Sequence, residues 1–169
     1  LYDARGISCQ YVEKPVITSL ENAVGGIEIT WGEAKGAEFY LILRREAGAE
    51  KWTQIAKRSK SAGTVYKDTS VTDGKTYEYD VNSATDTFES TSSDVGNSIT
   101  FVDAPSITAV INTLSGIKLE WSAHKNATHY IIYRKAVGYD AQLLEYAESS
   151  TTSFTDKNVI AGKSYIYSV

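Results

Sequence analysis

The sequence predicts an all-β protein built from β-sandwiches in tandem. The first observation is a repeat: "GIEITW" (26–31) returns as "GIKLEW" (116–121), and Pro15 and Pro105 keep the same offset of 90. The second is a period of two in hydrophobicity within these segments, which is typical of strands with one buried face. The third is a composition with 42% hydrophobic residues, enough to build a core, in which 12 Tyr against 4 Phe, with plentiful Thr, Ser and Val, suits strands with one exposed and one buried face.

The first element precedes Pro15. "ARGISCQYVEKP" (4–15) aligns with "DVGNSITFVDAP" (94–105), which is expected to supply the last strand of a sandwich. Residues 1–13 are therefore predicted to be the last strand of a preceding module, or a strand exchanged between chains. Cys9 stands where Ile99 stands in the copy, so we expect a buried structural thiol there rather than a nucleophile.

The following elements complete one module and begin another. Two further pairs of segments correspond, "GAEFYLILRRE" (36–46) with "NATHYIIYRKA" (126–136) and "TVYKDTSVTDGKTYEYDV" (64–81) with "TSFTDKNVIAGKSYIYSV" (152–169). The first pair is offset by 90 and the second by 88, so two residues are lost between them, where we expect a loop. The sequence thus predicts a complete module over 14–103 and a second module, lacking its last strand, over 104–169.

The order Pro, "GIxIxW", "YxIxR", "DxxVxxGxxYxYxV" resembles fibronectin type III modules, in the variety found in tandem on bacterial surface proteins. The resemblance covers essentially the whole chain and implies immunoglobulin-like sandwiches of two sheets. It implies that Trp31 and Trp121 fill the cores. It also implies that Tyr77 and Tyr165 form tyrosine corners, whose hydroxyls bond to backbone groups a few residues upstream.

Several classes of function find no support in the sequence. The net charge is −4 without a long run of Lys or Arg, which argues against a nucleic-acid partner. No apolar run approaches the roughly 20 residues that span a bilayer, so no membrane span is expected in this chain. The single cysteine excludes an internal disulfide and a cysteine-based zinc site.

We expect no catalytic, cofactor-binding or metal-binding residue, and therefore no enzyme activity in this chain; the activity of its parent protein stays open. His124 and His129 correspond to Ala34 and Phe39, so a site shared by the modules does not depend on them. Asp68 and its counterpart recur at a turn, where a bond to the backbone is the ordinary role of such a carboxylate.

The remaining candidate is a binding surface. On the third strand, the alternation that turns Tyr40 and Ile42 inward turns their neighbours outward. The residues of this candidate surface are Phe39, Leu41, Trp52, Tyr133 and Tyr139. The alternative is that Trp52 covers its own sheet, or that neighbouring modules pack there.

These observations favour non-catalytic structural, spacer and interaction modules of a bacterial cell-surface or secreted, hence extracellular, protein. The short linkers "VEKP" and "VDAP" contain no flexible run and are expected to limit bending. One alternative is a module that binds a glycan or a host protein. Another is an accessory region of a large secreted hydrolase. The expected partners are neighbouring modules, a glycan or protein ligand, and further copies of the chain through strand exchange.

Overall fold

The computed structural model describes residues 9–169. The chain divides into two compact units, Leu1–Phe101 (unit 1) and Val102–Val169 (unit 2). The one helical element among the described residues is the short 3-10 helix η1, Lys60–Ala62. None of the described helices has the length and hydropathy that crossing a membrane requires.

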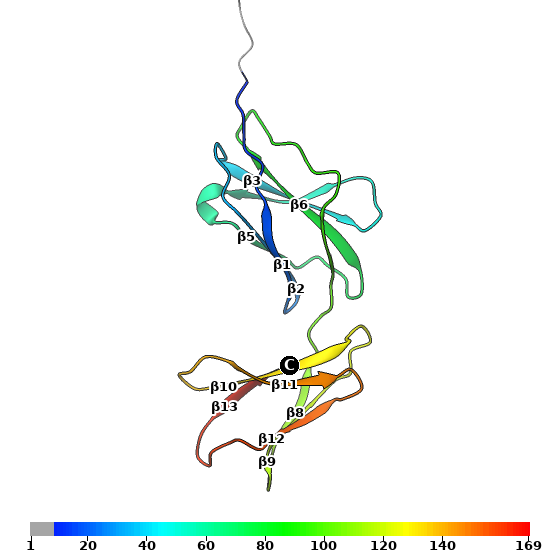
Figure 1. Ribbon diagram of the computed structural model, residues 1–169, viewed down its shortest axis with the longest axis vertical. Coiled ribbons are helices and arrows are strands. Elements are labelled where there is room, and N and C mark those ends of the chain that lie inside the picture. The colour runs from blue at the N-terminus through cyan, green and yellow to red at the C-terminus, as the bar shows by residue number, and fades with distance from the viewer. Residues whose placement is uncertain (1–8) are drawn as a thin grey trace, which may run out of the picture. The chain divides into compact units, whose positions relative to one another are not determined.

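Unit 1 contains two antiparallel sheets (Figure 1). The first has the order β1-β2-β5, with β1 at Ile17–Ala23, β2 at Gly26–Trp31 and β5 at Val65–Asp68. The second has the order β4-β3-β6-β7, with β4 at Thr53–Ser59, β3 at Phe39–Glu46, β6 at Thr76–Ala84 and β7 at Asn97–Thr100.

Unit 2 repeats this arrangement over its described strands. The first sheet has the order β12-β9-β8, with β12 at Ser153–Asp156, β9 at Gly116–Trp121 and β8 at Ile107–Thr113. The second has the order β11-β10-β13, with β11 at Gln142–Glu148, β10 at His129–Ala136 and β13 at Tyr165–Ser168. Among the described residues no strand stands in the position that β7 holds in unit 1.

Each unit is a sandwich because its two sheets share one core. In unit 1, Trp31 of β2 is 2% exposed and packs edge-on against Tyr40 of β3, with ring centroids 5.4 Å apart. In unit 2, Trp121 and Tyr130 repeat the contact at 5.6 Å. The predicted fold, tandem fibronectin type III-like β-sandwiches with tryptophan-filled cores, is confirmed.

The predicted tyrosine corners are also present. The hydroxyl of Tyr77 accepts a hydrogen bond from the Thr72 N–H at 2.9 Å, and that of Tyr165 accepts one from the Ile160 N–H at 3.0 Å. The turns before these strands carry glycines with φ of 80° and 81°, a conformation that side chains disfavour. In both units this latch therefore fixes the loop between the two sheets.

The segment before Pro15 differs from one expectation. Cys9 is exposed, so the prediction of a buried thiol is wrong. Its counterpart Ile99 is partly buried because β7 pairs with β6, whereas residues 9–13 belong to no strand. Residues 1–8 lie outside the described part of the chain, and the assignment of 1–13 to another module remains a prediction.

Candidate functional site

An ion pair linked to a tyrosine joins the two sheets of unit 1. The carboxylate of Asp68, at the end of β5, accepts a bond from the Arg44 guanidinium of β3 at 2.7 Å. It also accepts bonds from the Tyr79 hydroxyl of β6 at 2.8 Å and the Ser70 N–H at 2.9 Å. The predicted turn bond of Asp68 is therefore confirmed, but the sequence analysis missed the arginine and the tyrosine.

Unit 2 contains the same cluster. Asp156 accepts bonds from Arg134 and Tyr167, both at 2.9 Å, and from the Asn158 N–H at 2.9 Å. All three side chains recur at the offsets of 90 and 88 that relate the modules. That recurrence was the signal in the sequence that these residues form one group.

The protonation states of this cluster make it a structural link rather than an acid–base site. Burial raises the pKa of Asp68, but the hydrogen bonds from Ser70, Tyr79 and Arg44 outweigh it, and the pKa lies below its usual value. Burial, followed by the bond to Asp68, raises the pKa of Tyr79 far above its usual value. At neutral pH the carboxylate is ionised and the phenol is protonated, so neither group is ready to exchange a proton.

The lowered pKa of Asp68 predicts a loss of stability in acid. Between the unfolded pKa of about 3.9 and the lower native pKa, the unfolded chain binds more protons than the folded one. The contribution of Asp68 is therefore present above about pH 4 and is lost as the pH falls below it. In urea titrations of unit 1, the advantage of the parent chain over Asp68→Asn should shrink through this range. An advantage that stays constant from pH 6 to pH 2 would contradict the assignment.

A second polar cluster closes a gap at the edge of β6 in unit 1. The Lys14 ammonium donates to Asp80 Oδ2 at 2.8 Å, to Asn82 Oδ1 at 2.9 Å and to the Thr91 carbonyl at 3.0 Å. Asp80, which is 5% exposed, also accepts a bond from the Ser93 N–H at 2.7 Å. Lys14 thus ties the segment before β1 to the return segment 85–96 between β6 and β7.

The reason for this cluster lies in the strand pairing. β7 pairs with β6 only as far as Tyr79 and Asn97. Beyond that pair, the Val81 N–H donates to the Asp80 side chain at 3.0 Å, and the Val81 carbonyl accepts a bond from Lys14 at 3.4 Å. The side chains of the cluster therefore replace hydrogen bonds that a longer β7 would make.

Replacing Lys14 with alanine is expected to destabilise unit 1 by about 1–3 kcal/mol, because it leaves a nearly buried carboxylate with fewer donors. The matched control is Lys75→Ala, which removes an exposed ion pair with Glu46 in the same unit, and it should change stability far less. Chemical denaturation measures both. Equal effects of the two substitutions would refute the role given to Lys14.

The candidate surface residues of unit 1 pack against their own unit. Leu41 is 7% exposed, and Phe39 is half-buried with the Lys57 ammonium 3.9 Å from its ring centroid. Trp52 is half-buried under the guanidinium of Arg45, which lies 4.3 Å from its ring. Its indole N–H donates to the Ser93 carbonyl at 3.0 Å. Trp52 therefore packs against its own sheet, which is the arrangement that the alternative interpretation of this surface describes.

The candidate residues of unit 2 are exposed. Tyr133 of β10 is 37% exposed, and Tyr139, in the turn before β11, is 72% exposed. Tyr133 belongs to a larger apolar surface on the side of the sheet that faces away from the core. We call this surface the outer face of unit 2; it comprises Ile131, Tyr133, Leu143, Tyr146 and Ile166. Strand pairing places Ile131 beside Tyr146, and Tyr133 beside Leu143.

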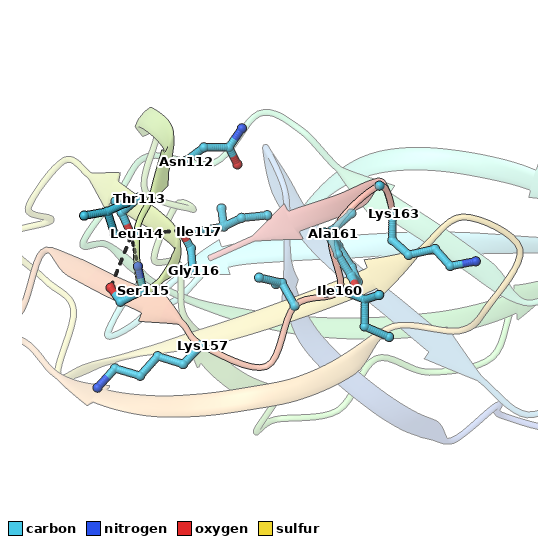
Figure 2. Close-up of a pocket in the computed structure, with 13 residues that line it drawn as sticks. Asn112, Thr113, Leu114, Ser115, Gly116, Ile117, Lys157, Ile160, Ala161 and Lys163 are labelled. Atoms are coloured by element: carbon cyan, nitrogen blue, oxygen red, sulfur yellow. Dashed lines mark hydrogen bonds between the residues drawn. The ribbon is translucent and has the colours of Figure 1, made fainter.

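An open cavity of about 520 Å³ lies at one end of unit 2 (Figure 2). The β8–β9 turn, 112–116, forms one wall, and the loop 157–163 forms the other. Ile117 of the core and Tyr165 of the tyrosine corner also line it. A second cavity of about 520 Å³ shares Ile160, Gly162, Lys163 and Tyr165 with the first and is completed by Tyr139 and its neighbours.

The two histidines of unit 2 make local contacts. His124 accepts a bond from the Asn126 N–H within its own turn, while His129 lies beside Tyr146, with ring centroids 6.1 Å apart. Across residues 9–169, no group of three or more His, Cys, Asp or Glu residues is arranged to hold a metal ion.

Comparison with known proteins gives similar solved structures but no similar sequence family. No family model and no curated protein matches the sequence. Among solved structures, the chain is similar to the FN1–FN3 domains of chicken CNTN1, with a TM-score of 0.48 and 19% identity over 92% of this chain and 58% of that one. It is also similar to a segment of two fibronectin type III domains from chicken tenascin, with a TM-score of 0.43 and 10% identity over 90% of this chain and 87% of that one.

Proposed function

We propose that the chain is a non-catalytic structural and spacer array of a secreted or cell-surface bacterial protein. The observation that supports this is that the side chains repeated between the two units have structural roles in both. The same tryptophan, tyrosine, arginine and aspartate residues fill the core and join the sheets in both units. Residues that two copies share are thus used to hold each sandwich together, as expected of a module whose function is mechanical. An accessory role beside a catalytic domain of the parent protein is compatible with the same use.

The linker "VDAP" (102–105) is the part of the chain that a spacer requires to be stiff. It is short, and its proline has a fixed φ and no N–H. NMR relaxation measures whether the two units tumble together. The chain is expected to show one rotational correlation time for both units, and the double variant Ala104→Gly/Pro105→Gly to show two. Pro15→Gly is the matched control, since it alters a proline outside this linker. Independent tumbling of the units in the parent chain would exclude a spacer role.

The outer face of unit 2 supports a second candidate function, the binding of a glycan. Tyr146 is 61% exposed, Ile166 60% and Leu143 45%, whereas Leu41 and Leu43, on the corresponding face of unit 1, are each 7% exposed. Contiguous exposed apolar side chains mark interaction sites, and tyrosine combines a flat ring with a hydroxyl that bonds to polar ligands. The outer face of unit 2 thus has the chemistry to stack on a sugar ring.

A glycan array with the full chain tests this function. Binding should be lost in Tyr133→Ala/Tyr146→Ala, because both side chains stand on the outer face, and should persist in Tyr11→Ala, which removes an exposed tyrosine of unit 1. Circular dichroism confirms that each variant is folded. Binding that survives the double substitution would place the ligand elsewhere, and capture of a protein through the same tyrosines would replace the glycan with a protein partner.

A further inference from the structure

In unit 1, the side-chain nitrogen of Lys14 lies against the side-chain amide of Asn82. The Lys14 Nζ donates to Asn82 Oδ1 at 2.9 Å, so this nitrogen lies beside the Cγ atom that carries the oxygen. Asn82 belongs to β6 and is 1% exposed, and Lys14 is half-buried. A lysine nitrogen held against a carboxamide has the arrangement from which a new amide bond can form.

Two carboxylates flank this pair of groups. Asp80 Oδ2 accepts a bond from the same Lys14 nitrogen at 2.8 Å, and Glu89 Oε1 accepts one from Asn82 Nδ2 at 2.9 Å. Both distances lie within the range over which a general base or acid transfers a proton. One carboxylate thus contacts the attacking nitrogen, and the other contacts the nitrogen that would leave.

Asp80 and Asn82 are themselves fixed by further hydrogen bonds. Asp80 Oδ1 accepts a bond from the Val81 N–H at 3.0 Å, and Oδ2 accepts one from the Ser93 N–H at 2.7 Å. Asn82 Nδ2 also donates to the Ser92 hydroxyl at 2.9 Å. The amide therefore turns its oxygen toward the lysine and its nitrogen toward Glu89, which is the orientation that attack at Cγ requires.

The backbone on either side of Lys14 is anchored to unit 1. The Glu13 N–H donates to the Lys35 carbonyl at 3.1 Å, and the Lys35 N–H donates to the Glu13 side chain at 3.0 Å. The Glu13 carbonyl accepts a bond from the hydroxyl of Ser83, the residue that follows Asn82. Pro15 is buried. The lysine is therefore held beside β6 for as long as unit 1 is folded, and a slow reaction between fixed groups avoids the entropic cost of bringing them together.

We propose that Lys14 and Asn82 form an isopeptide bond, in which Nζ is joined to Cγ and one ammonia is released. Asp80 accepts a proton from the Lys14 ammonium, and the free amine attacks Cγ. The bond between Cγ and Nδ2 then breaks. Nδ2 takes up the two protons that the lysine nitrogen gives up, carried by Asp80 and Glu89, and departs as ammonium. One ammonium and one carboxamide thus give one secondary amide and one ammonium ion, so atoms and charge balance without a co-reactant.

The position of this bond suits the proposed spacer role, on which the following consequence rests. The bond joins the segment before β1 directly to β6. Tension along the chain would pass through it, and β1 to β5, which lie between Lys14 and Asn82 in the sequence, would carry none. The stability difference given above for Lys14→Ala holds for the chain before the bond forms. The bond increases this difference, because a closed loop has fewer conformations when unfolded.

The intact mass of the full chain, measured under denaturing conditions, tests the proposal. After folding, the parent chain should be lighter than its sequence by one ammonia molecule, and a protease digest should contain a branched peptide that joins Lys14 to Asn82. Lys14→Arg keeps the positive charge but replaces the amine with a guanidinium that stays protonated, so this variant should have the mass of its own sequence. Lys75→Arg, the same exchange at an exposed lysine of unit 1, is the matched control and should still lose ammonia.

Two variants test the carboxylates. Asp80→Ala and Glu89→Gln keep both reacting groups, and each should slow bond formation by about a hundredfold or more, the usual contribution of general acid–base catalysis. Circular dichroism checks that each variant is folded, and Glu89 is exposed, so its replacement leaves the core unchanged. Unchanged rates in both variants would refute the proposed proton transfers.

Three results would overturn the bond between Lys14 and Asn82. The first is a parent chain that keeps the mass of its sequence after prolonged incubation in the folded state. The second is the loss of water instead of ammonia, which would place the bond on Asp80. The third is a loss of ammonia that persists in Lys14→Arg, which would come from cyclisation of an asparagine. None of these masses depends on how the two units tumble, so failure of the bond and failure of the spacer role are separate results.

Discussion

Replacing Trp31 with alanine is expected to lower the free energy of unfolding of unit 1 by about 3–5 kcal/mol, the range for truncating a buried tryptophan. The indole is 2% exposed and contacts Tyr40 at the centre of the core, where the surrounding strands cannot move inward to fill the space. A small domain has a total stability of about 5–15 kcal/mol, so this single change removes a large part of it.

Differential scanning calorimetry measures the effect on each unit. Trp31→Ala should shift the transition of unit 1 and leave that of unit 2 in place, while Trp121→Ala should do the reverse. Trp52→Ala is the matched control in unit 1, because Trp52 lies half-buried outside the core cluster and should cost less. If Trp31→Ala and Trp52→Ala lowered the transition equally, Trp31 would not be the centre of the core.

Replacing Asp68 with alanine is expected to cost unit 1 about 3 kcal/mol, because it leaves the Arg44 guanidinium without its carboxylate in a partly buried site. The Asp68 side chain is 1% exposed and that of Arg44 is 21% exposed, so water replaces only part of the lost interaction. The hydroxyl of Tyr79 loses its acceptor as well. Denaturant unfolding of the parent chain and the variant measures the difference.

A double-mutant cycle separates the ion pair from its surroundings. Removing Arg44 together with Asp68, as Arg44→Met/Asp68→Ala, should cost less than the sum of the single changes, since no charge is then left unpaired. Tyr79→Phe, which removes one hydroxyl and keeps the ring, should cost about 1 kcal/mol. Additive losses for Asp68 and Arg44 would show that the two side chains do not act as a pair.

The repeat and the alternation were sufficient to predict the sandwiches and their cores. Trp31, Tyr40 and Tyr77 recur in both modules with the same phase, and burial of one strand face is a local consequence of that phase. The tyrosine corners were predicted from the resemblance to fibronectin type III modules, and the structure shows that this latch is local, because it joins Tyr77 to Thr72, five residues earlier.

Contacts between distant residues were harder to predict. Asp68 was assigned a turn bond, which is local, whereas its bond to Arg44 requires the register of three strands in two sheets. Lys14 has no counterpart in the second module, where Ala104 stands, so the repeat gave no signal for it. Lys14 bonds to Asp80 and Asn82 on the part of β6 that no longer pairs with β7, and the end of that pairing is not visible in the sequence.

The candidate surface shows a related limit. Alternation predicts that Leu41 and its counterpart Ile131 both point away from the core, but it does not predict what covers them. In unit 1, Phe88 of the return segment 85–96 lines a cavity with Leu41, which is 7% exposed. In unit 2, Ile131 is half-buried, and its neighbours Tyr133 and Tyr146 on the outer face are exposed. The hydrophobic pattern therefore predicts which side of the sheet a side chain lies on but not how exposed it is.

Hydrogen exchange of the three indole N–H groups, followed by NMR, tests the central claim that the repeated tryptophans exist to fill the cores. The indole nitrogens of Trp31 and Trp121 are buried without a hydrogen-bond partner among the described residues, so only burial protects them from exchange. Both should exchange as slowly as the core amides of their own units, and Trp52 should exchange first, although its N–H bonds to Ser93. Exchange of Trp31 and Trp121 as fast as that of Trp52 would contradict the account.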